Sequence, residues 1–573
     1  MPLFRLRSLN ARSLFMATLI ALVTLAITAL GPQPVSVAQP PTDKATSTVT
    51  TDAEPGHRDD AMRDLQQDEA SNNVRAYGHW GDLPEGYSNW TNHTNRLIPI
   101  YTFGITLSSL REQGSVYADP KRLSELAQHP SSNESLNLQA TYYDQTDLYR
   151  LQKHAVEQGY NNIVMIVFDG MDWQTTRAAA LYRNGADVYQ SGRGSGLAFQ
   201  DDFHVVTDFS SIVTSAAASG AKTDVDAQRV LSVKQSHYFG YDPRLGGRWA
   251  WSERAGDQYI EGRDRLRPHT VTDSASSATS MFSGIKTYNG SINYTVDGEQ
   301  VTPLARELQS EQDFMVGLVT SVPVSHATPA AAYANNVARK DYQDIARDLL
   351  GLPSSAHREN PLSGVDVLLG AGWGDETKTE AQQGQNFANG NKYIHQADVE
   401  QVDLQNGGRY RVVQRQAGVD GSRSLLKAAQ QAADNGDRLL GLFGNAAGHL
   451  PYSTADGNFN PADDQRKAET VTQADIDENP SLAEMTEAAL TVLEQSVDGF
   501  WLLIEPGDVD WANHANNLDN SIGAVFEGEK AFKKVVQWAD ENETWDHTAI
   551  IITADHGHYL VIDKPEAIAN AGK

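Results

Sequence analysis

The sequence of 573 residues contains no cysteine. Disulfide bonds are therefore excluded as a source of stability, and so is a lipid anchor attached through cysteine. Internal repeats are also absent. Stability must come from core packing and bound metal ions. With 40% hydrophobic residues, the chain has enough apolar material for a large core, in one big α/β domain or two smaller ones.

Basic residues are scarce relative to acidic ones. The sequence has 46 Lys and Arg against 74 Asp and Glu, which gives a net charge of -28. Such a charge repels nucleic acids and anionic membrane surfaces, so no nucleic-acid binding is expected. A phosphate-bearing substrate would have to be attracted by a local cluster of cations, which bound metal ions can supply. Most of the acidity is typical of a solvated surface.

The first 38 residues have the pattern of a signal peptide. Several arginines precede an apolar stretch from Leu14 to Leu30, and Ser36-Val37-Ala38 resembles a cleavage site. We therefore predict export to the periplasm or the medium and no stable membrane span after cleavage; an uncleaved N-terminal anchor is the alternative. Residues 39–75 are predicted to form a flexible linker, because they are rich in Pro, Thr, Asp and Gln. Residues 76–160 show no motif and are predicted to wrap the main domain.

Residues 161–573 alternate between short apolar runs and helical stretches. A capping box at Ser481 and Glu484 predicts the start of one helix, and another is predicted over 518–540. This alternation predicts an α/β catalytic domain with a mostly parallel central sheet and helices on both faces. The polar stretches near 183–267 and 373–437 are predicted to be insertions at the rim, which either decorate the surface or influence substrate choice. The runs predicted as strands buried on both faces are 163–168, 314–320, 365–369, 439–443, 500–505 and 548–553.

Polar side chains with metal-binding chemistry follow several of these runs. Asp169 follows the first, Glu505 ends the fifth, and Asp555 follows the last. A single carboxylate in such a place is usually a helix cap, but ligand sites of open α/β sheets lie beyond the carboxyl ends of strands, so these groups are expected to meet. Asp510 and His514 are four residues apart, which on a helix places both within reach of one ion. Carboxylate and imidazole ligands together suit zinc, whereas oxygen ligands suit magnesium.

The hydroxyl-rich segment 271–280 is predicted to open a helix. A serine at a helix start meets unpaired backbone N–H groups and the positive end of the helix dipole, which favour an alkoxide and a bound anion. The four serines of this segment can equally act as caps, and position alone does not single one out.

Five segments in order resemble the alkaline phosphatase family. Each alone would be weak, but together they extend from about residue 161 to the end. The resemblance implies the α/β fold of that family, hydrolysis of small phosphate monoesters to an alcohol and inorganic phosphate, and a family in which homodimers are common. The segments are Asp169-Gly170-Met171, Asp273 to Thr279 with 284–290, His326-Ala327-Thr328-Pro329, 505–514, and Thr553-Ala554-Asp555-His556-Gly557-His558.

The resemblance also implies a role for each matched residue. Ser274 is the implied nucleophile, which forms a phosphoserine intermediate, and Arg339 is the implied clamp on the phosphate oxygens. Trp511 stands where the enteric bacterial enzyme has Lys, so the hold on phosphate and the metal preference are expected to differ. The supporting residues implied around these groups are Asp273, His326, Trp511 and His558. The implied metal ligands are Asp169, Asp555 and His556 for one Zn²⁺, Asp510 and His514 for a second Zn²⁺, and Asp169, Thr328 and Glu505 for one Mg²⁺.

One ligand expected from the resemblance has no counterpart after the last motif. Family members carry a further histidine there, which completes the second zinc site together with another strand, but only fifteen residues follow His558. Our first interpretation is that the C-terminal part is missing, in which case the second zinc is expected to bind weakly. The alternative is a ligand drawn from the other histidines.

Other function classes remain open at this point. Phosphodiesterases, sulfatases and phosphomutases of the same superfamily share the paired-metal geometry. Thr328 and Glu505 favour the monoesterase branch, and the sequence has no Cys/Ser-x-Pro-x-Arg segment of the sulfatase type. A catalytically impaired fragment that binds metal or phosphate is a further alternative. Ser274 discriminates against it, because a pure binder needs no nucleophile.

Overall fold

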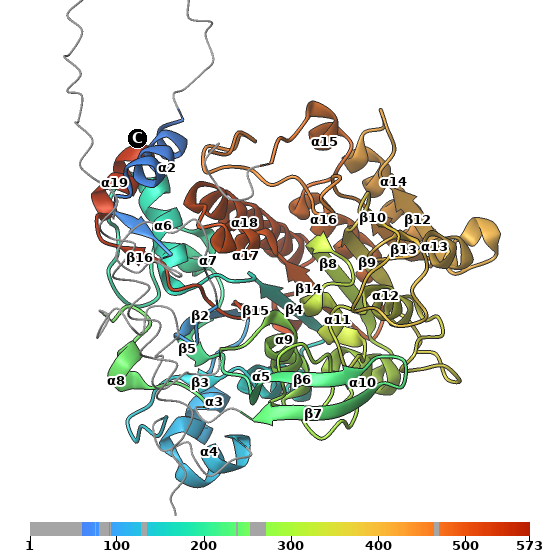
Figure 1. Ribbon diagram of the computed structural model, residues 1–573, viewed down its shortest axis with the longest axis horizontal. Helices are drawn as coiled ribbons and strands as arrows, with labels where there is room; N and C mark the ends of the chain where they lie inside the picture. Colours follow the sequence, from blue (N-terminus) through green and yellow to red (C-terminus); the bar gives the residue numbers. More distant parts are fainter. Residues whose placement is uncertain are drawn as a thin grey trace, which may run out of the picture. The chain divides into compact units, whose positions relative to one another are not determined.

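The computed structural model describes residues 60–74, 76–79, 91, 93–127, 135–235, 239–252, 271–462 and 469–573. These belong to one unit, Asp59–Lys573 (Figure 1). The predicted signal peptide and most of the predicted linker lie outside the described residues. Within them, no helix combines the length and the apolar character needed to cross a membrane.

A ten-stranded sheet forms the centre of this unit. Its first seven strands run parallel to one another, β2 is antiparallel to both β15 and β5, and β3 is parallel to β5. The predicted mostly parallel sheet is confirmed, and all six predicted strands belong to it. In spatial order the strands are β12 (Tyr410–Gln414), β13 (Arg438–Leu442), β9 (Val367–Ala371), β8 (Met315–Pro323), β14 (Phe500–Glu505), β4 (Asn162–Val167), β15 (Thr548–Thr553), β2 (Ile98–Phe103), β5 (Thr207–Val213) and β3 (Tyr143–Asp144).

Four strands of the sheet come from segments in which no strand was predicted. Residues 76–160 supply β2 and β3, and the two predicted insertions supply β5 and β12. Partial exposure is the physical reason for two of them, whereas β2 is buried along its whole length, so exposure does not explain why it was not predicted. Strands β5 and β12 are only partly buried and carry polar side chains, so they lack the continuous apolar run that marks a strand covered on both faces.

Helices cover both faces of the sheet (Figure 1). Contacts join α14 to α16, α16 to α18 and α18 to α6 in one row, and join α5, α9, α11 and α10 in another. The capping box predicted at Ser481 is confirmed at the start of α16. The bounds of the longer helices are α2 (Ala61–Asn72), α5 (Asp147–Glu157), α6 (Trp173–Asn184), α9 (Ser274–Ser283), α10 (Leu304–Gln312), α11 (Ala327–Tyr333), α12 (Tyr342–Leu350), α14 (Gly421–Asn435), α16 (Leu482–Leu493), α18 (Leu518–Glu541) and α19 (Pro565–Ala571).

Shorter elements decorate this framework. The hairpin of β6 (Ala218–Asp224) and β7 (Arg229–Gln235) lies within the first predicted insertion. Two further pairs are β1 (Tyr77–Gly78) with β16 (Val561–Ile562), and β10 (Glu376–Thr377) with β11 (Gly390–Asn391). The remaining helices are α3 (Ser108–Gln113), α4 (Pro120–Ala127), α7 (Ala198–Asp201), α8 (Pro243–Gly246), α13 (Gln396–Val402), α15 (Gln473–Asp477) and α17 (Asp508–His514), with the 3-10 turns η1 (Val116–Ala118), η3 (Leu404–Asn406) and η4 (Trp545–His547).

Candidate active site

The carboxyl ends of three neighbouring strands bring the predicted ligands together. Strand β4 lies between β14 and β15, with Ile166 opposite both Ile504 and Ile552. Because the three strands are parallel, the residues that follow them emerge at one edge of the sheet. Asp169, Glu505, Asp555 and His556 are all buried there. The predicted convergence of these segments is therefore found in the fold.

Ser274 lies at the centre of the first group of ligands. Its Oγ is 3.3 Å from Asp169 Oδ2 and 3.4 Å from His556 Nε2. His556 Nε2 is in turn 3.3 Å from Asp169 Oδ1 and 3.3 Å from Asp555 Oδ2. One atom of each of Asp169, Asp555 and His556 lies close enough to the others to share an ion. Ser274 is the first residue of α9, whose N-cap is Asp273.

The buried oxygens of this group favour a bound cation. Asp169 Oδ1 and Asp555 Oδ2 have no hydrogen-bond partner within the described part of the chain. Burial and the neighbouring Asp555 carboxylate raise the pKa of Asp169 well above its usual value, and burial raises the pKa of Asp555 to about 6. Burying a carboxylate costs free energy unless the carboxylate is paired or coordinates a metal, so these residues fit the metal ion that the resemblance implies.

Glu505 is one of the three residues implied for the magnesium site. Its carboxylate accepts a hydrogen bond from Thr320 and is buried. Burial raises the pKa of Glu505 to about 7, against the lowering effect of the Thr320 and Thr328 hydroxyls. The negative charge of Glu505 also contributes to the raised pKa of Asp169. Asp169, Thr328 and Glu505 are thus neighbours, and their donors are all oxygens, as Mg²⁺ prefers.

Asp510 is surrounded by histidines. Its Oδ1 is 3.4 Å from His514 Nε2, on the same face of α17, as the spacing of four predicted. The same oxygen is 2.7 Å from His558 Nε2 and 3.8 Å from His556 Nε2. Burial alone would raise the pKa of Asp510, but His514 and His558 outweigh it and hold that pKa well below the usual range. Asp510 is therefore a charged carboxylate between the two groups of ligands.

His93 is a site residue that the sequence analysis missed. Its Nε2 is 3.0 Å from His514 Nε2 and 3.7 Å from Asp510 Oδ1. Its ring stacks on that of His556, with centroids 3.6 Å apart. The group of residues whose ligand atoms can share an ion comprises His93, Asp510, His556 and His558. His93, from the N-terminal segment, thus lies beside Asp510 and His514, for which the resemblance implied a further histidine ligand.

The hydrogen bonds of His93 and His514 decide which nitrogens face each other. His93 Nδ1 is 2.8 Å from the carbonyl oxygen of Thr272, and His514 Nδ1 is 3.0 Å from that of Thr91. Carbonyl oxygens only accept, so in each ring the hydrogen is assigned to Nδ1 and Nε2 faces the other ring. Burial and the neighbouring His514 lower the pKa of His93 to about 4, so its ring is neutral at pH 7 and its Nε2 carries a lone pair. That lone pair can bind a cation.

No strong sequence signal pointed to His93. Parallel strands deliver ligands from the residues that follow their carboxyl ends, and His93 precedes an apolar run. Strand β2 is antiparallel to β15, so its beginning lies at that edge. His93 comes shortly before β2. A histidine before an apolar run becomes informative only once the direction of the strand is known.

Arg339 is held over the start of α9. Its Nη1 is 3.0 Å from Asp273 Oδ2, and its backbone N–H donates to the Gly290 carbonyl at 2.8 Å. Asp273 also accepts from the backbone N–H groups of Ser276 and Gly290. Burial lowers the pKa of Arg339, but the Asp273 carboxylate outweighs that effect and the pKa is raised. The guanidinium is therefore fixed and charged.

His326 and Trp511 belong to an aromatic cluster beside this site. The His326 ring stacks on Tyr342 at 5.6 Å and lies 5.9 Å from the Trp511 ring, which in turn packs against His449 at 4.8 Å. Burial lowers the pKa of His326 to about 3, so its ring is neutral. These contacts place both side chains beside the site and surround His326 with aromatic rings.

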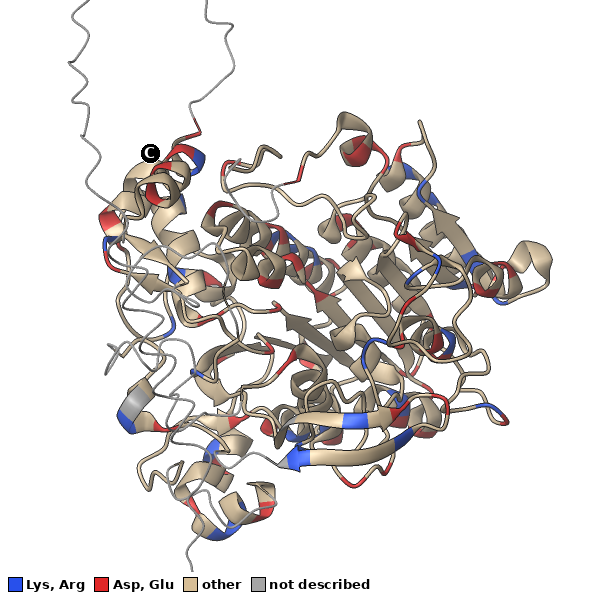
Figure 2. Cartoon of the chain, in the orientation of Figure 1, with Lys and Arg blue, Asp and Glu red and all other residues tan. Residues whose placement is uncertain are grey.

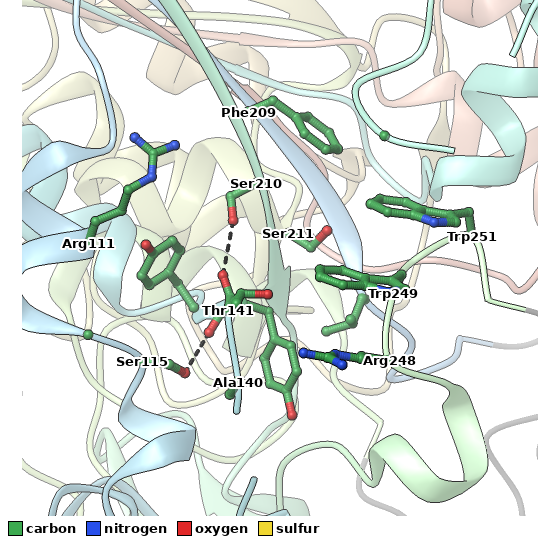
Figure 3. A pocket seen from close by; sticks show the side chains of 15 residues that line it. Arg111, Ser115, Ala140, Thr141, Phe209, Ser210, Ser211, Arg248, Trp249 and Trp251 are labelled. Carbon is green, nitrogen blue, oxygen red and sulfur yellow. Dashed lines mark hydrogen bonds between the residues drawn. The ribbon is translucent and has the colours of Figure 1, made fainter. Parts of the chain in front are cut away.

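A separate cavity of about 510 Å³ lies beside strand β5 (Figure 3). Trp249 and Trp251 stack in parallel on one side, with centroids 5.4 Å apart, and Arg111 and Ser210 lie on the other. None of the candidate site residues lines this cavity. The candidate active site is therefore identified from the chemistry of its side chains and not from the volume of a cavity.

Comparison with known proteins finds similar sequences among alkaline phosphatases. The alkaline phosphatase 3 of Bacillus subtilis is 29% identical over 305 residues, which is 52% of this chain and 53% of the relative. Alkaline phosphatase H of Pseudomonas aeruginosa is 30% identical over 326 residues (54% of this chain, 62% of the relative), and the Escherichia coli alkaline phosphatase is 29% identical over 326 residues (54% and 63%). The chain thus matches between 53% and 63% of the length of these relatives.

Solved structures and a family profile complete the comparison. A cold-active alkaline phosphatase from Shewanella has a TM-score of 0.40 at 21% identity, covering 69% of this chain and 68% of that one. The alkaline phosphatase of Thermus thermophilus gives 0.41 at 21%, covering 70% and 60%. The profile of the alkaline phosphatase family matches residues 253–568, more than half of the chain. On that sequence match, the chain belongs to the alkaline phosphatase family.

Proposed function

We propose that this chain hydrolyses phosphate monoesters to an alcohol and inorganic phosphate through a phosphoserine formed on Ser274. The observation that carries the proposal is the position of Ser274 Oγ, 3.3 Å from Asp169 and 3.4 Å from His556, at the first residue of a helix. A pure metal binder has no use for a hydroxyl in that place. The start of α9 also favours the negative charge that develops on this oxygen.

Three groups of residues would hold the metals. When bound, the ions would lower the pKa of the serine hydroxyl, neutralise charge on the phosphoryl group, and activate the water that ends the reaction. Mixed carboxylate and imidazole groups fit zinc, and the all-oxygen group fits magnesium. The ligands we propose are Asp169, Asp555 and His556 for one Zn²⁺; Asp510, His514 and His93 for the other; and Asp169, Thr328 and Glu505 for Mg²⁺.

His93 replaces the ligand that the sequence analysis could not find. The resemblance places a histidine together with a further strand after the last motif. Here His93 precedes β2, and β2 is the antiparallel neighbour of β15, the strand that carries Asp555 and His556. We therefore propose a complete second zinc site, in place of the weak one expected when no third ligand was apparent.

The protein groups have distinct tasks in the reaction. Ser274 Oγ attacks phosphorus, the bond from phosphorus to the ester oxygen breaks, and that oxygen leaves as the alcohol. Arg339 presents a planar fork that binds two phosphate oxygens, and Asp273 fixes its direction. His558 donates to Asp510 and keeps its carboxylate oriented. Water then cleaves the phosphoserine, releases phosphate and restores Ser274.

The proposal also covers the cellular context of the protein. We propose that the protein works in the periplasm or outside the cell on small phosphate monoesters, without binding nucleic acid, and that it assembles as a homodimer. The leader-like N-terminus supports the location, and the net charge of -28 supports the absence of nucleic-acid binding. The frequency of dimers in the family supports the third.

Rates on three substrates test the proposed activity. Protein loaded with Zn²⁺ and Mg²⁺ should cleave a phosphate monoester faster than a phosphodiester or a sulfate ester, and Ser274→Ala should lose at least ~10³-fold in kcat. Ser280→Ala is a matched control, because Ser280 is buried in the same helix and donates only to the Ser276 carbonyl. Phosphate trapped on Ser274 at low pH should be visible by mass spectrometry. Faster diester cleavage, or an active Ser274→Ala protein, would contradict the proposal.

A further inference from the structure

Three aspartates that play no part in the chemistry above lie around the start of α18. Asp60 is the N-cap of α2, Asp456 lies in the loop 454–458, and Asp519 is in the first turn of α18. The backbone N–H of Ala455 donates to Asp519 Oδ1 at 2.9 Å, which joins the loop to the helix. Gln66 of α2 accepts from the Asp519 backbone N–H at 3.1 Å, which joins the two helices. Figure 2 shows acidic residues on both α2 and α18.

Two carboxylate oxygens in this cluster are buried without a partner. Asp519 is fully buried, at 0% exposure, and its Oδ2 accepts no hydrogen bond from any described residue. Asp60 Oδ2 is equally enclosed and also without a donor in the described part of the chain. Asp456 differs, because it is exposed and its oxygens accept from Thr454 and Asn458. A buried carboxylate oxygen that has lost its water needs a donor or a cation.

The charges around these oxygens do not balance. Burial first, and then repulsion by Asp60 and Asp456, raise the pKa of Asp519 to about 8. Burial and repulsion by Asp456 likewise raise the pKa of Asp60. Among the described residues, Arg63 is the cation that acts on both, and its Nε donates to the Pro461 carbonyl at 3.3 Å. Within the described part of the chain the carboxylates Asp60, Asp456 and Asp519 thus outnumber the one guanidinium, and a divalent cation would neutralise the excess.

We propose that a hard divalent cation, Ca²⁺ or Mg²⁺, binds between Asp60 and Asp519, with water completing its coordination and Asp456 adding negative charge at the rim. The available ligand atoms are all oxygens, which exclude a preference for softer metals. The ion would tie α2 to the first turn of α18 and to the loop 454–458. It is a stabilising site, separate from Ser274 and from the ligands of the active site.

The test measures binding and stability in the full chain loaded with Zn²⁺ and with the one Mg²⁺ of the active site, without excess Mg²⁺. Adding Ca²⁺ should raise the Tm by a few degrees, as expected for an ion that binds only the folded state, and equilibrium dialysis should find one additional Ca²⁺ per chain. Raising Mg²⁺ in place of Ca²⁺ shows which cation the site selects. Asp519→Asn should abolish both effects. Asp68→Asn, on the exposed side of α2, should retain them.

The competing explanation is a proton shared by Asp60 and Asp519. In that case wild type would bind no additional cation, neither Ca²⁺ nor Mg²⁺ would raise its Tm, and Asp519→Asn would be at least as stable as wild type. Any of these results overturns the proposal, as does a Ca²⁺ response that survives in Asp519→Asn. Should Asp519→Asn fail to fold, Asp60→Asn is the second variant. Phosphatase activity should stay unchanged in both variants, because neither aspartate touches the active site.

Discussion

Replacing His93 by alanine tests the proposed second zinc site most directly. The change removes an imidazole nitrogen 3.0 Å from His514 Nε2 and 3.7 Å from Asp510. Zinc sites with four protein ligands contribute about 10–16 kcal/mol, so one ligand accounts for about 2.5–4 kcal/mol. At about 1.4 kcal/mol per decade, zinc affinity at this position should fall by roughly 10²–10³-fold.

Zinc titration and kinetics together give the assay. In His93→Ala, kcat at limiting zinc should fall steeply, and millimolar zinc should restore part of it, because Asp510 and His514 remain. The first zinc, held by Asp169, Asp555 and His556, should bind as in wild type. Metal analysis after dialysis should therefore show loss of one zinc and retention of the other.

A matched control separates ligand loss from loss of packing. His357 has a similarly enclosed side chain, 12% exposed against 16% for His93, and it pairs with Asp348 away from the active site. His357→Ala should keep both zinc ions and full kcat. If His93→Ala also retains both zinc ions with wild-type affinity, the assignment of His93 as a ligand is wrong.

Three further predictions concern stability and backbone geometry. Ser481→Ala removes the capping box of α16 and should lower the free energy of unfolding by about 1 kcal/mol in denaturant titration, with kcat unchanged. Gly170→Ala places a Cβ 2.9 Å from the Asp510 backbone at a φ of +74°, so it should weaken zinc binding as well as stability. The control Gly114→Ala, at a φ of +68° with no atom within 4 Å of the added Cβ, should cost only the backbone strain of about 1–2 kcal/mol. Equal loss of zinc in both variants would refute the argument. Burial and the nearby Asp344 carboxylate raise the pKa of Asp341 to about 6, so its contribution to stability is present below about pH 4 and lost as the pH rises through 6. Relative to Asp341→Asn, wild type should therefore lose up to about 3 kcal/mol of unfolding free energy between pH 4 and pH 7, and parallel pH profiles would contradict this.

The sequence by itself determined the parallel part of the fold and most of the site. Six apolar runs became strands because a strand covered on both faces must be apolar along its whole length, which is visible without coordinates. Parallel strands deliver the residues after them to one edge, so Asp169, Glu505 and Asp555 were expected to meet and do. The spacing of four placed Asp510 and His514 on one helical face, and the structure has them there.

Only the tertiary structure decided which other segments reach that edge. The direction of β2 is set by its pairing with β15 and β5, a long-range contact that no local pattern encodes. That direction alone turns His93 toward Asp510. Strands β5 and β12 escaped prediction because partial exposure lets polar residues interrupt their apolar pattern. The position of Asp60 relative to Asp519 likewise depends on how α2 packs against α18, since the two residues are far apart in the sequence and isolated aspartates carry no signal of burial.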